Sequence, residues 1–159
     1  MPKLRISKLP RHAHTHAYGD ADPLPPYSID RSQINALGAL NVSTAIPLMG
    51  TGGRYAPPAP IYPQDLKKSL VPLAATLTWE GTFGSGETVT IRITAVYNDG
   101  TSASITRSAT AAGSISLNPA DLAELYAHGK YITRLEVASV SSAPTTSVTT
   151  RVTIYALEI

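Results

Sequence analysis

Three histidines near the N-terminus are the residues whose types and spacing could best support chemistry. His12, His14 and His16 occupy every second position of the stretch RHAHTHAYGDAD. In an extended chain such side chains share one face, with neighbours about 6.6 Å apart. Two histidines placed in this way can chelate zinc, and Asp20 or Asp22 could add an oxygen ligand.

A usable metal site also needs further groups that fix the orientation of its ligands. The histidine run lies in a basic segment bounded by prolines, outside the part of the sequence that can build a core. We therefore predict no metal and no cofactor. If a partner surface completed a site, the candidate ligands would be His12, His14 and His16.

No other motif predicts a catalytic centre. The stretch GTGGR lacks the Lys-Ser/Thr pair of a phosphate-binding loop, and GSG at residues 84–86 lacks the context of a nucleophile elbow. His128 ends a predicted helix, where the helix dipole favours its charged form. The chain has no cysteine, which excludes disulfides and thiolate chemistry. We predict that the protein is not an enzyme.

The chain divides into two parts of different composition, and this division decides what can position the histidines. Eleven of the 13 prolines lie in residues 1–72. The same part holds eight Lys/Arg against four Asp/Glu, whereas residues 73–159 hold five against seven. Proline fixes φ and lacks an N–H, so residues 1–72 are predicted to be an extended arm without long helices or central strands.

Apolar residues scattered among the prolines distinguish this arm from a typical disordered tract. An extended segment of this kind suits contact with a partner surface, and its positive charge favours an acidic one. The first thirty residues contain no apolar stretch of signal-peptide length, and no window of about 18 apolar residues predicts a membrane helix. The predicted partner-binding residues of the arm are Lys3, Arg5, Lys8, Arg11, His12, His14, His16, Tyr18, Tyr27, Arg54, Tyr55 and Tyr62.

From residue 73 onward apolar and polar residues alternate, as in half-buried strands. The residues expected to face the core from the first strand, 73–80, are Leu73, Ala75, Leu77 and Trp79. Those from the second strand, 88–97, are Val89, Ile91, Ile93, Ala95 and Tyr97. Asn98-Asp99-Gly100 then predicts a hairpin turn. Further strands are predicted at residues 101–110, 114–117, 131–140 and 147–159.

One helix is predicted, over residues 118–129, with the sequence NPADLAELYAHG. Asn118 is a good N-cap, Pro119 suits the first turn, and Gly129 can end the helix. Without crossover helices a parallel sheet is not expected. The sequence therefore predicts an all-β protein, an antiparallel β-sandwich of jelly-roll or immunoglobulin-like type with one short helix, which is preceded by a long extended N-terminal arm.

The arm up to YPQDLKK and the strands ETVTIRITAVYNDGTSASI and YITRLEVASV together resemble the decoration (auxiliary or cement) proteins of tailed-phage capsids in overall architecture. The resemblance implies a structural virion protein on the capsid exterior, made in the host cytoplasm. It implies that the major capsid protein and other copies of the chain, as a homotrimer, are the partners. We expect no membrane partner and no nucleic-acid partner, since the body is slightly acidic.

Two other functions remain open. The chain could be a subunit of an extracellular filament in which the arm donates a strand to the next copy, although its prolines disfavour a long donated strand. It could also be a carbohydrate-binding or receptor-binding β-sandwich. That function would require exposed aromatic side chains, and beyond Trp79 and Phe83 the body offers only tyrosines for this purpose.

Overall fold

The computed structural model describes residues 39–46, 49–61 and 69–158, and within them the fold is an all-β sandwich. These residues contain nine strands and one short 3-10 turn. In chain order they are β1 (Ala39–Ala45), β2 (Met49–Gly50), β3 (Ala59–Pro60), β4 (Leu70–Thr82), β5 (Val89–Tyr97), β6 (Ser102–Ala109), β7 (Gly113–Leu117), the 3-10 turn η2 (Ala123–Leu125), β8 (Ile132–Ser141) and β9 (Ser147–Glu158).

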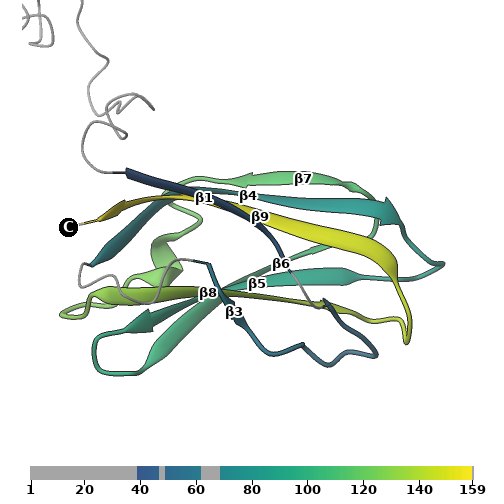
Figure 1. The fold of residues 1–159 in the computed structure, drawn as a ribbon, viewed down its shortest axis with the longest axis horizontal. Helices are drawn as coiled ribbons and strands as arrows, with labels where there is room; N and C mark the ends of the chain where they lie inside the picture. Colours follow the sequence, from purple (N-terminus) through teal and green to yellow (C-terminus); the bar gives the residue numbers. More distant parts are fainter. Residues whose placement is uncertain (1–38, 47–48, 62–68, 159) are drawn as a thin grey trace, which may run out of the picture. The chain divides into compact units, whose positions relative to one another are not determined.

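The strands form two layers that face each other across the core (Figure 1). One layer has the order β1-β9-β4-β7, and the other has the order β8-β5-β6 with β2 and β3 added to β8. All pairs are antiparallel except the two-residue pair of β2 with β8. The layers join at one corner, where Leu70 of β4 pairs with Ile132 of β8. The predicted antiparallel β-sandwich is therefore confirmed.

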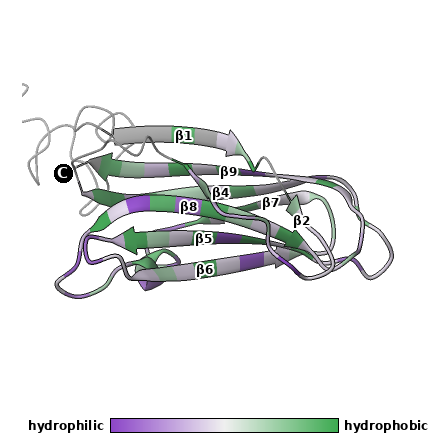
Figure 2. Ribbon diagram, turned by 60° about the horizontal axis from the view of Figure 1, so that its bottom comes forward, coloured by the Kyte–Doolittle hydropathy of each residue, from purple (hydrophilic) through white to green (hydrophobic). Residues whose placement is uncertain are grey.

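The core lies between the layers and is built from the alternate residues that the period-two pattern predicted. Every second residue of β5, from Val89 to Tyr97, is buried, as expected. Trp79 of β4 is fully buried, and its indole N–H donates to the carbonyl of Val89 at 3.1 Å. This bond satisfies the one polar atom that the tryptophan brings into an apolar core. Figure 2 shows apolar residues alternating with polar ones along the strands.

The first part of β4 differs from the predicted alternation. The register of β4 against β9 shifts between Pro72 and Ala74, so Leu73 is a bulge residue and is only partly buried, while Leu70 and Pro72 are buried. The prediction that Leu73 faces the core was wrong. Pro72 has no N–H to donate to a neighbouring strand, which favours a bulge at this position. The bulge lies before the part of β4 that pairs with β7, since that pairing starts at Ala75.

The predicted helix over residues 118–129 is reduced to the 3-10 turn at Ala123–Leu125. Asn118 does cap the chain here, because its side-chain oxygen accepts from the N–H groups of Ala120 and Asp121 at 2.8 and 3.1 Å. Leu122 and Leu125 are both buried, at the three-residue spacing of a 3-10 turn. The two leucines close this end of the sandwich core, and the chain forms a short 3-10 turn here in place of the longer helix.

The predicted hairpin at residues 98–100 is present, with a three-residue loop. The N–H of Tyr97 donates to the carbonyl of Thr101 at 2.8 Å, and Gly100 has a φ of 82°. Glycine takes this left-handed conformation without strain. The loop joins β5 to β6, which forms the outer edge of its layer.

Part of the predicted arm belongs to the sandwich. β1 pairs with β9 over all seven of its residues, and β3 and β2 pair with β8. These strands lie at sheet edges or are two residues long, as the prolines of this region require. The predicted boundary at residue 72 thus runs through β4, and residues 39–61 supply strands to the body.

Candidate functional site

Only two of the predicted partner-binding residues lie within the described part of the chain. Arg54 is exposed, whereas Tyr55 is half-buried and its ring lies under the guanidinium of Arg92, 4.0 Å from its centroid. Arg92 is on the outward face of β5, so this cation–π contact seats the arm on the body of its own chain. The other predicted residues lie outside the described residues, and their partner-binding role stays a prediction. They are Lys3, Arg5, Lys8, Arg11, His12, His14, His16, Tyr18, Tyr27 and Tyr62.

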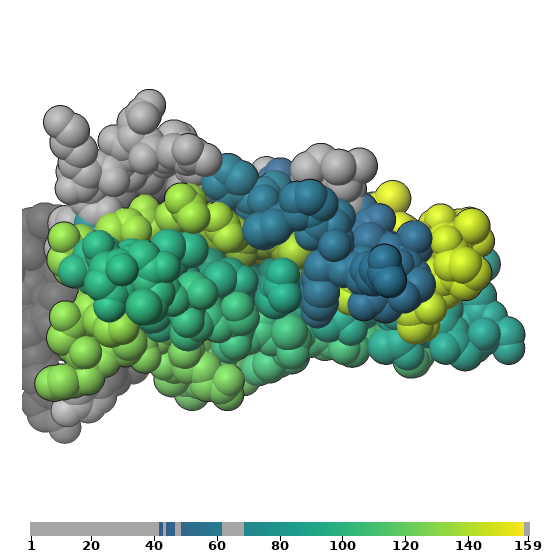
Figure 3. Space-filling model, turned by 90° about the horizontal axis from the view of Figure 1, so that it is seen from below, coloured from purple at the N-terminus to yellow at the C-terminus, as the bar shows by residue number. Residues whose placement is uncertain are grey.

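Residues 49–61 cover the side of the second layer along β8. Ala138 and Val140 of β8 lie opposite Arg92 and Thr90, on the face that points away from the core. They are nevertheless only 2% and 8% exposed. Figure 3 shows this segment, in blue, packed against the green strands of the body. The arm therefore buries an otherwise exposed apolar strip of the sheet.

Backbone hydrogen bonds hold the same segment in place. The N–H of Ile61 donates to the carbonyl of Leu135 at 2.9 Å. The N–H groups of Gly52 and Gly53 donate to the carbonyls of Ala143 and Ser141 at 2.7 and 3.0 Å. Such bonds depend on an available sheet edge and hardly on side-chain identity, which is how an extended peptide adds to a sheet.

A buried carboxylate organises one end of the sandwich. Glu87 is 4% exposed and accepts hydrogen bonds from the Ser141 hydroxyl at 2.6 Å and the Gly84 N–H at 2.7 Å. These donors, led by the Ser141 hydroxyl and joined by Thr146, lower the pKa of Glu87 below its usual value. A hollow of about 280 Å³ lies beside it, lined also by Phe83.

This arrangement is that of a structural carboxylate. Both oxygens of Glu87 already accept hydrogen bonds, one from the loop that precedes β5 and one from the last residue of β8. In the described part of the chain, no second titratable side chain lines the hollow. General acid–base catalysis requires a group that can exchange a proton with a substrate, usually with a pKa near the working pH. Glu87 therefore fits loop anchoring rather than catalysis.

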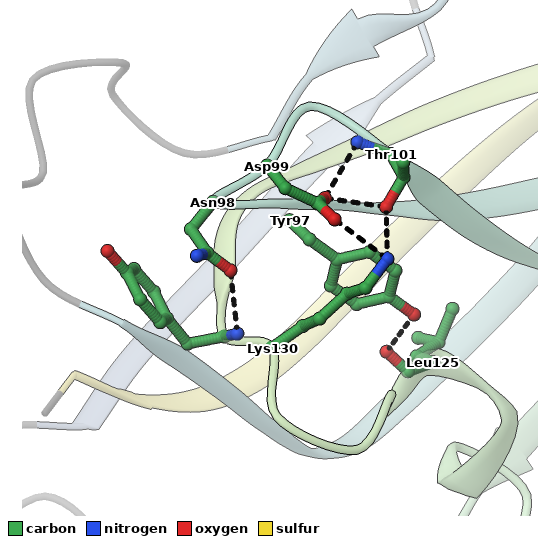
Figure 4. A network of polar contacts seen from close by, with 7 residues as sticks. Tyr97, Asn98, Asp99, Thr101, Leu125 and Lys130 are labelled. Atoms are coloured by element: carbon green, nitrogen blue, oxygen red, sulfur yellow. Dashed lines mark hydrogen bonds and ion pairs between the residues drawn. The ribbon is translucent and has the colours of Figure 1, made fainter.

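A polar network ties two loops together at the opposite end (Figure 4). The ammonium of Lys130 lies 2.8 Å from Oδ2 of Asp99 and donates to the hydroxyl of Thr101 at 2.7 Å. It also lies 5.5 Å from the centre of the Tyr97 ring. The Tyr97 hydroxyl donates to the carbonyl of Leu125 at 3.0 Å. Lys130, and then Thr101, hold the pKa of Asp99 well below its usual range.

Two exposed tyrosines flank a second hollow beside this network. Tyr126 and Tyr131 are 44% and 52% exposed, and both line a hollow of about 260 Å³ together with Lys130. The Tyr126 hydroxyl donates to the carbonyl of Pro72. Partial burial raises the pKa of Tyr126, so its hydroxyl stays protonated.

Sequence reasoning missed the Tyr126/Tyr131 pair. The residues were available as the tyrosines on either side of His128-Gly129-Lys130, but the predicted helix placed Tyr126 on a helical turn. Because the chain leaves the 3-10 turn at Tyr126 in an extended conformation, both tyrosines instead lie on an irregular loop at the end of the sandwich. A signal that could have found them is their position outside the period-two pattern of the strands.

Residues 39–46, 49–61 and 69–158 contain no group of three or more His, Asp or Glu side chains that could hold a metal ion. The candidate ligands His12, His14 and His16 lie outside these residues. Within the same residues no helix has the length and apolar character needed to span a membrane. In comparisons with known proteins, no family model and no curated protein matches this chain.

Proposed function

We propose that the chain is a structural protein that decorates the outside of a viral capsid. In this proposal the β-sandwich forms an outer knob, copies of the chain associate as a trimer, and the residues before β1 lace over the major capsid protein and neighbouring copies. No enzymatic activity, cofactor, membrane or nucleic acid takes part. The resemblance to tailed-phage decoration proteins and the basic, proline-rich arm support this function.

One observation carries the proposal. Residues 39–61 of the arm add short strands to the edges of β9 and β8, and their prolines do not prevent it. The segment therefore already binds by the mode that lacing requires, which is backbone pairing with exposed sheet edges. Residues 1–38 continue the same composition and add the basic residues Lys3, Arg5, Lys8 and Arg11. Many copies bound to one lattice would reinforce each other through multivalency.

The sandwich also offers edges that a neighbouring copy could use. In the described part of the chain no strand pairs with the outer side of β6 or β7. β6 contains no proline, and its single charged residue is Arg107. Long edges with few charges accept further strands readily. Contacts between copies of a trimer could therefore form here without changing the fold of the body.

The test is to assemble virions with the full chain or with a variant that lacks residues 1–38. Electron cryo-microscopy of the particles then shows whether the knob is present. We expect the truncated chain to fold, as judged by its circular dichroism, and to be missing from the shells. Full occupancy by the truncated chain would refute lacing by the arm. Fibres formed by the purified full chain alone would favour the strand-donating filament instead.

A further inference from the structure

We propose that the hollow between Tyr126 and Tyr131 binds a single neutral sugar ring. The hollow lies where β4 and β8 begin, at the end of the sandwich opposite the Glu87 loops. The buried side chains of Leu70 and Ile132 contribute to its lining, and Tyr126, Tyr131 and Lys130 line it as well. Its volume of about 260 Å³ falls just below the range of about 300–1,000 Å³ for small-molecule sites, which suits one ring.

The exposure of the two tyrosines points to a ligand. Among the described residues, three large apolar or aromatic side chains are notably exposed, and two of them line this one hollow. A half-exposed tyrosine ring combines an apolar face with a polar tip. A pyranose ring has the matching chemistry, because its C–H groups can stack on an aromatic face while its hydroxyls bond to polar groups at the rim.

Hydrogen bonds hold the backbone of Tyr131 and the side chain of Tyr126 in place beside the hollow. The backbone of Tyr131 is bonded twice to Asn98, since its N–H donates to the Asn98 side-chain oxygen and its carbonyl accepts from the Asn98 N–H, both at 3.1 Å. Tyr126 is held by its hydroxyl at the carbonyl of Pro72. Binding to such a site costs little conformational entropy, so a weak stacking ligand can still be held.

The charges around the hollow favour a neutral ligand over an anion. Among the described residues that line the hollow, Lys130 is the one cation, and it is paired with the carboxylate of Asp99 at 2.8 Å and donates to Thr101 at 2.7 Å. Its charge is therefore already balanced within the chain. A phosphate or carboxylate would have to compete with Asp99 for the ammonium, whereas a sugar hydroxyl would not. The inference does not depend on the proposed capsid role, because it concerns the body and not the arm.

The test uses the full chain, labelled with nitrogen-15, and the methyl glycosides of glucose, galactose and N-acetylglucosamine. We expect at least one of them to shift the amide resonances of residues 126–132 in a saturable way. Tyr131→Ala should weaken that binding about tenfold or more, equivalent to at least about 1.4 kcal/mol. Ile115→Ala, which removes an exposed apolar side chain of β7 that does not line the hollow, should leave it unchanged.

Three results would overturn the inference. The first is that none of the glycosides shifts these resonances, and the second is that Tyr131→Ala binds as well as the parent chain. The third is a saturable response to inorganic phosphate in place of the glycosides, which would identify an anion site. Tyr126→Phe provides a second variant, because it keeps the ring and removes only the bond to Pro72. It should retain binding better than Tyr131→Ala does.

Discussion

At the scale of single residues, Glu87 shows how one buried carboxylate can set the pH range of stability. Its pKa is lowered in the folded protein, chiefly by the Ser141 hydroxyl and further by Thr146 and the Gly84 N–H. An unfolded chain then binds a proton more readily than the folded one, so the stabilising contribution is present above the unfolded pKa of about 4.3. It is lost as the pH falls through the lower folded pKa. We expect the melting temperature to fall over this acidic range.

The variants Glu87→Gln and Glu80→Gln separate this effect from a general loss of charge. Glutamine keeps one acceptor oxygen, so one of the two donors, the Ser141 hydroxyl or the Gly84 N–H, loses its partner in Glu87→Gln. Thermal unfolding followed by circular dichroism should show a lower melting temperature at pH 7 and a shallower decline toward acid. Glu80 is exposed, and its variant should follow the parent protein. Equal pH profiles for both variants would contradict the assignment.

At the scale of elements, the end of β4 depends on a glycine that no other residue can replace. Gly81 has a φ of 107°, and a Cβ added there would lie 2.3 Å from the carbonyl oxygen of Ser147 in β9. Gly81→Ala therefore combines backbone strain with a clash against backbone, and we expect it to cost more than about 3 kcal/mol or to prevent folding. Urea unfolding of the purified variant measures the cost.

Two other glycines allow the cost of backbone strain at Gly81 to be separated from the cost of the clash with β9. Gly100 has a φ of 82° with open space around it, so Gly100→Ala should cost about 1–2 kcal/mol from strain alone. Gly113 has neither a positive φ nor a close neighbour, and Gly113→Ala should change stability by no more than about 1 kcal/mol, in the stabilising direction if at all. A loss in Gly81→Ala no greater than that in Gly100→Ala would mean that β9 moves to make room.

Elements of the sandwich could be predicted where a local pattern decides their structure. The alternation of β5 and the turn at Gly100 depend on neighbouring residues, and both were predicted. Leu73 was misplaced because the bulge beside Pro72 arises from pairing with β9, which is distant in the sequence. The helix over residues 118–129 was too long because the burial of Leu122 and Leu125 against the sheets outweighed its good capping residues.

The candidate site was less predictable than the fold for a related reason. A hollow between Tyr126 and Tyr131 exists because Leu70 of β4 and Ile132 of β8 meet at the corner that joins the two layers. Period-two patterns fix which face a residue takes but not which strands are neighbours. Residues 39–61 posed the same difficulty, since the partners of their strands are distant in the sequence: Ala39 pairs with Leu157, and Pro60 pairs with Glu136.

At the scale of the whole molecule, the position at which the arm is truncated determines the stability of the remaining protein. Almost all of the buried core lies in residues 70–156, but Ile61 belongs to it, and Val42, Ile46 and Met49 pack against it. Removing residues 1–38 takes none of these side chains away. Removing residues 1–61 takes all of them and uncovers the edges of β8 and β9.

We therefore expect the two truncations to differ sharply in stability. Loss of residues 1–61 should cost more than about 3 kcal/mol, since fully burying one large apolar side chain contributes about 1.5–3 kcal/mol. It should also promote association, because unpaired strand edges recruit other chains. Loss of residues 1–38 should leave the melting temperature close to that of the full chain, and it should not produce the larger aggregates in size-exclusion chromatography that loss of residues 1–61 does. If both truncations melted alike, β1, β2 and β3 would be accessory strands, and residues 39–61 would be free to pair with a neighbour.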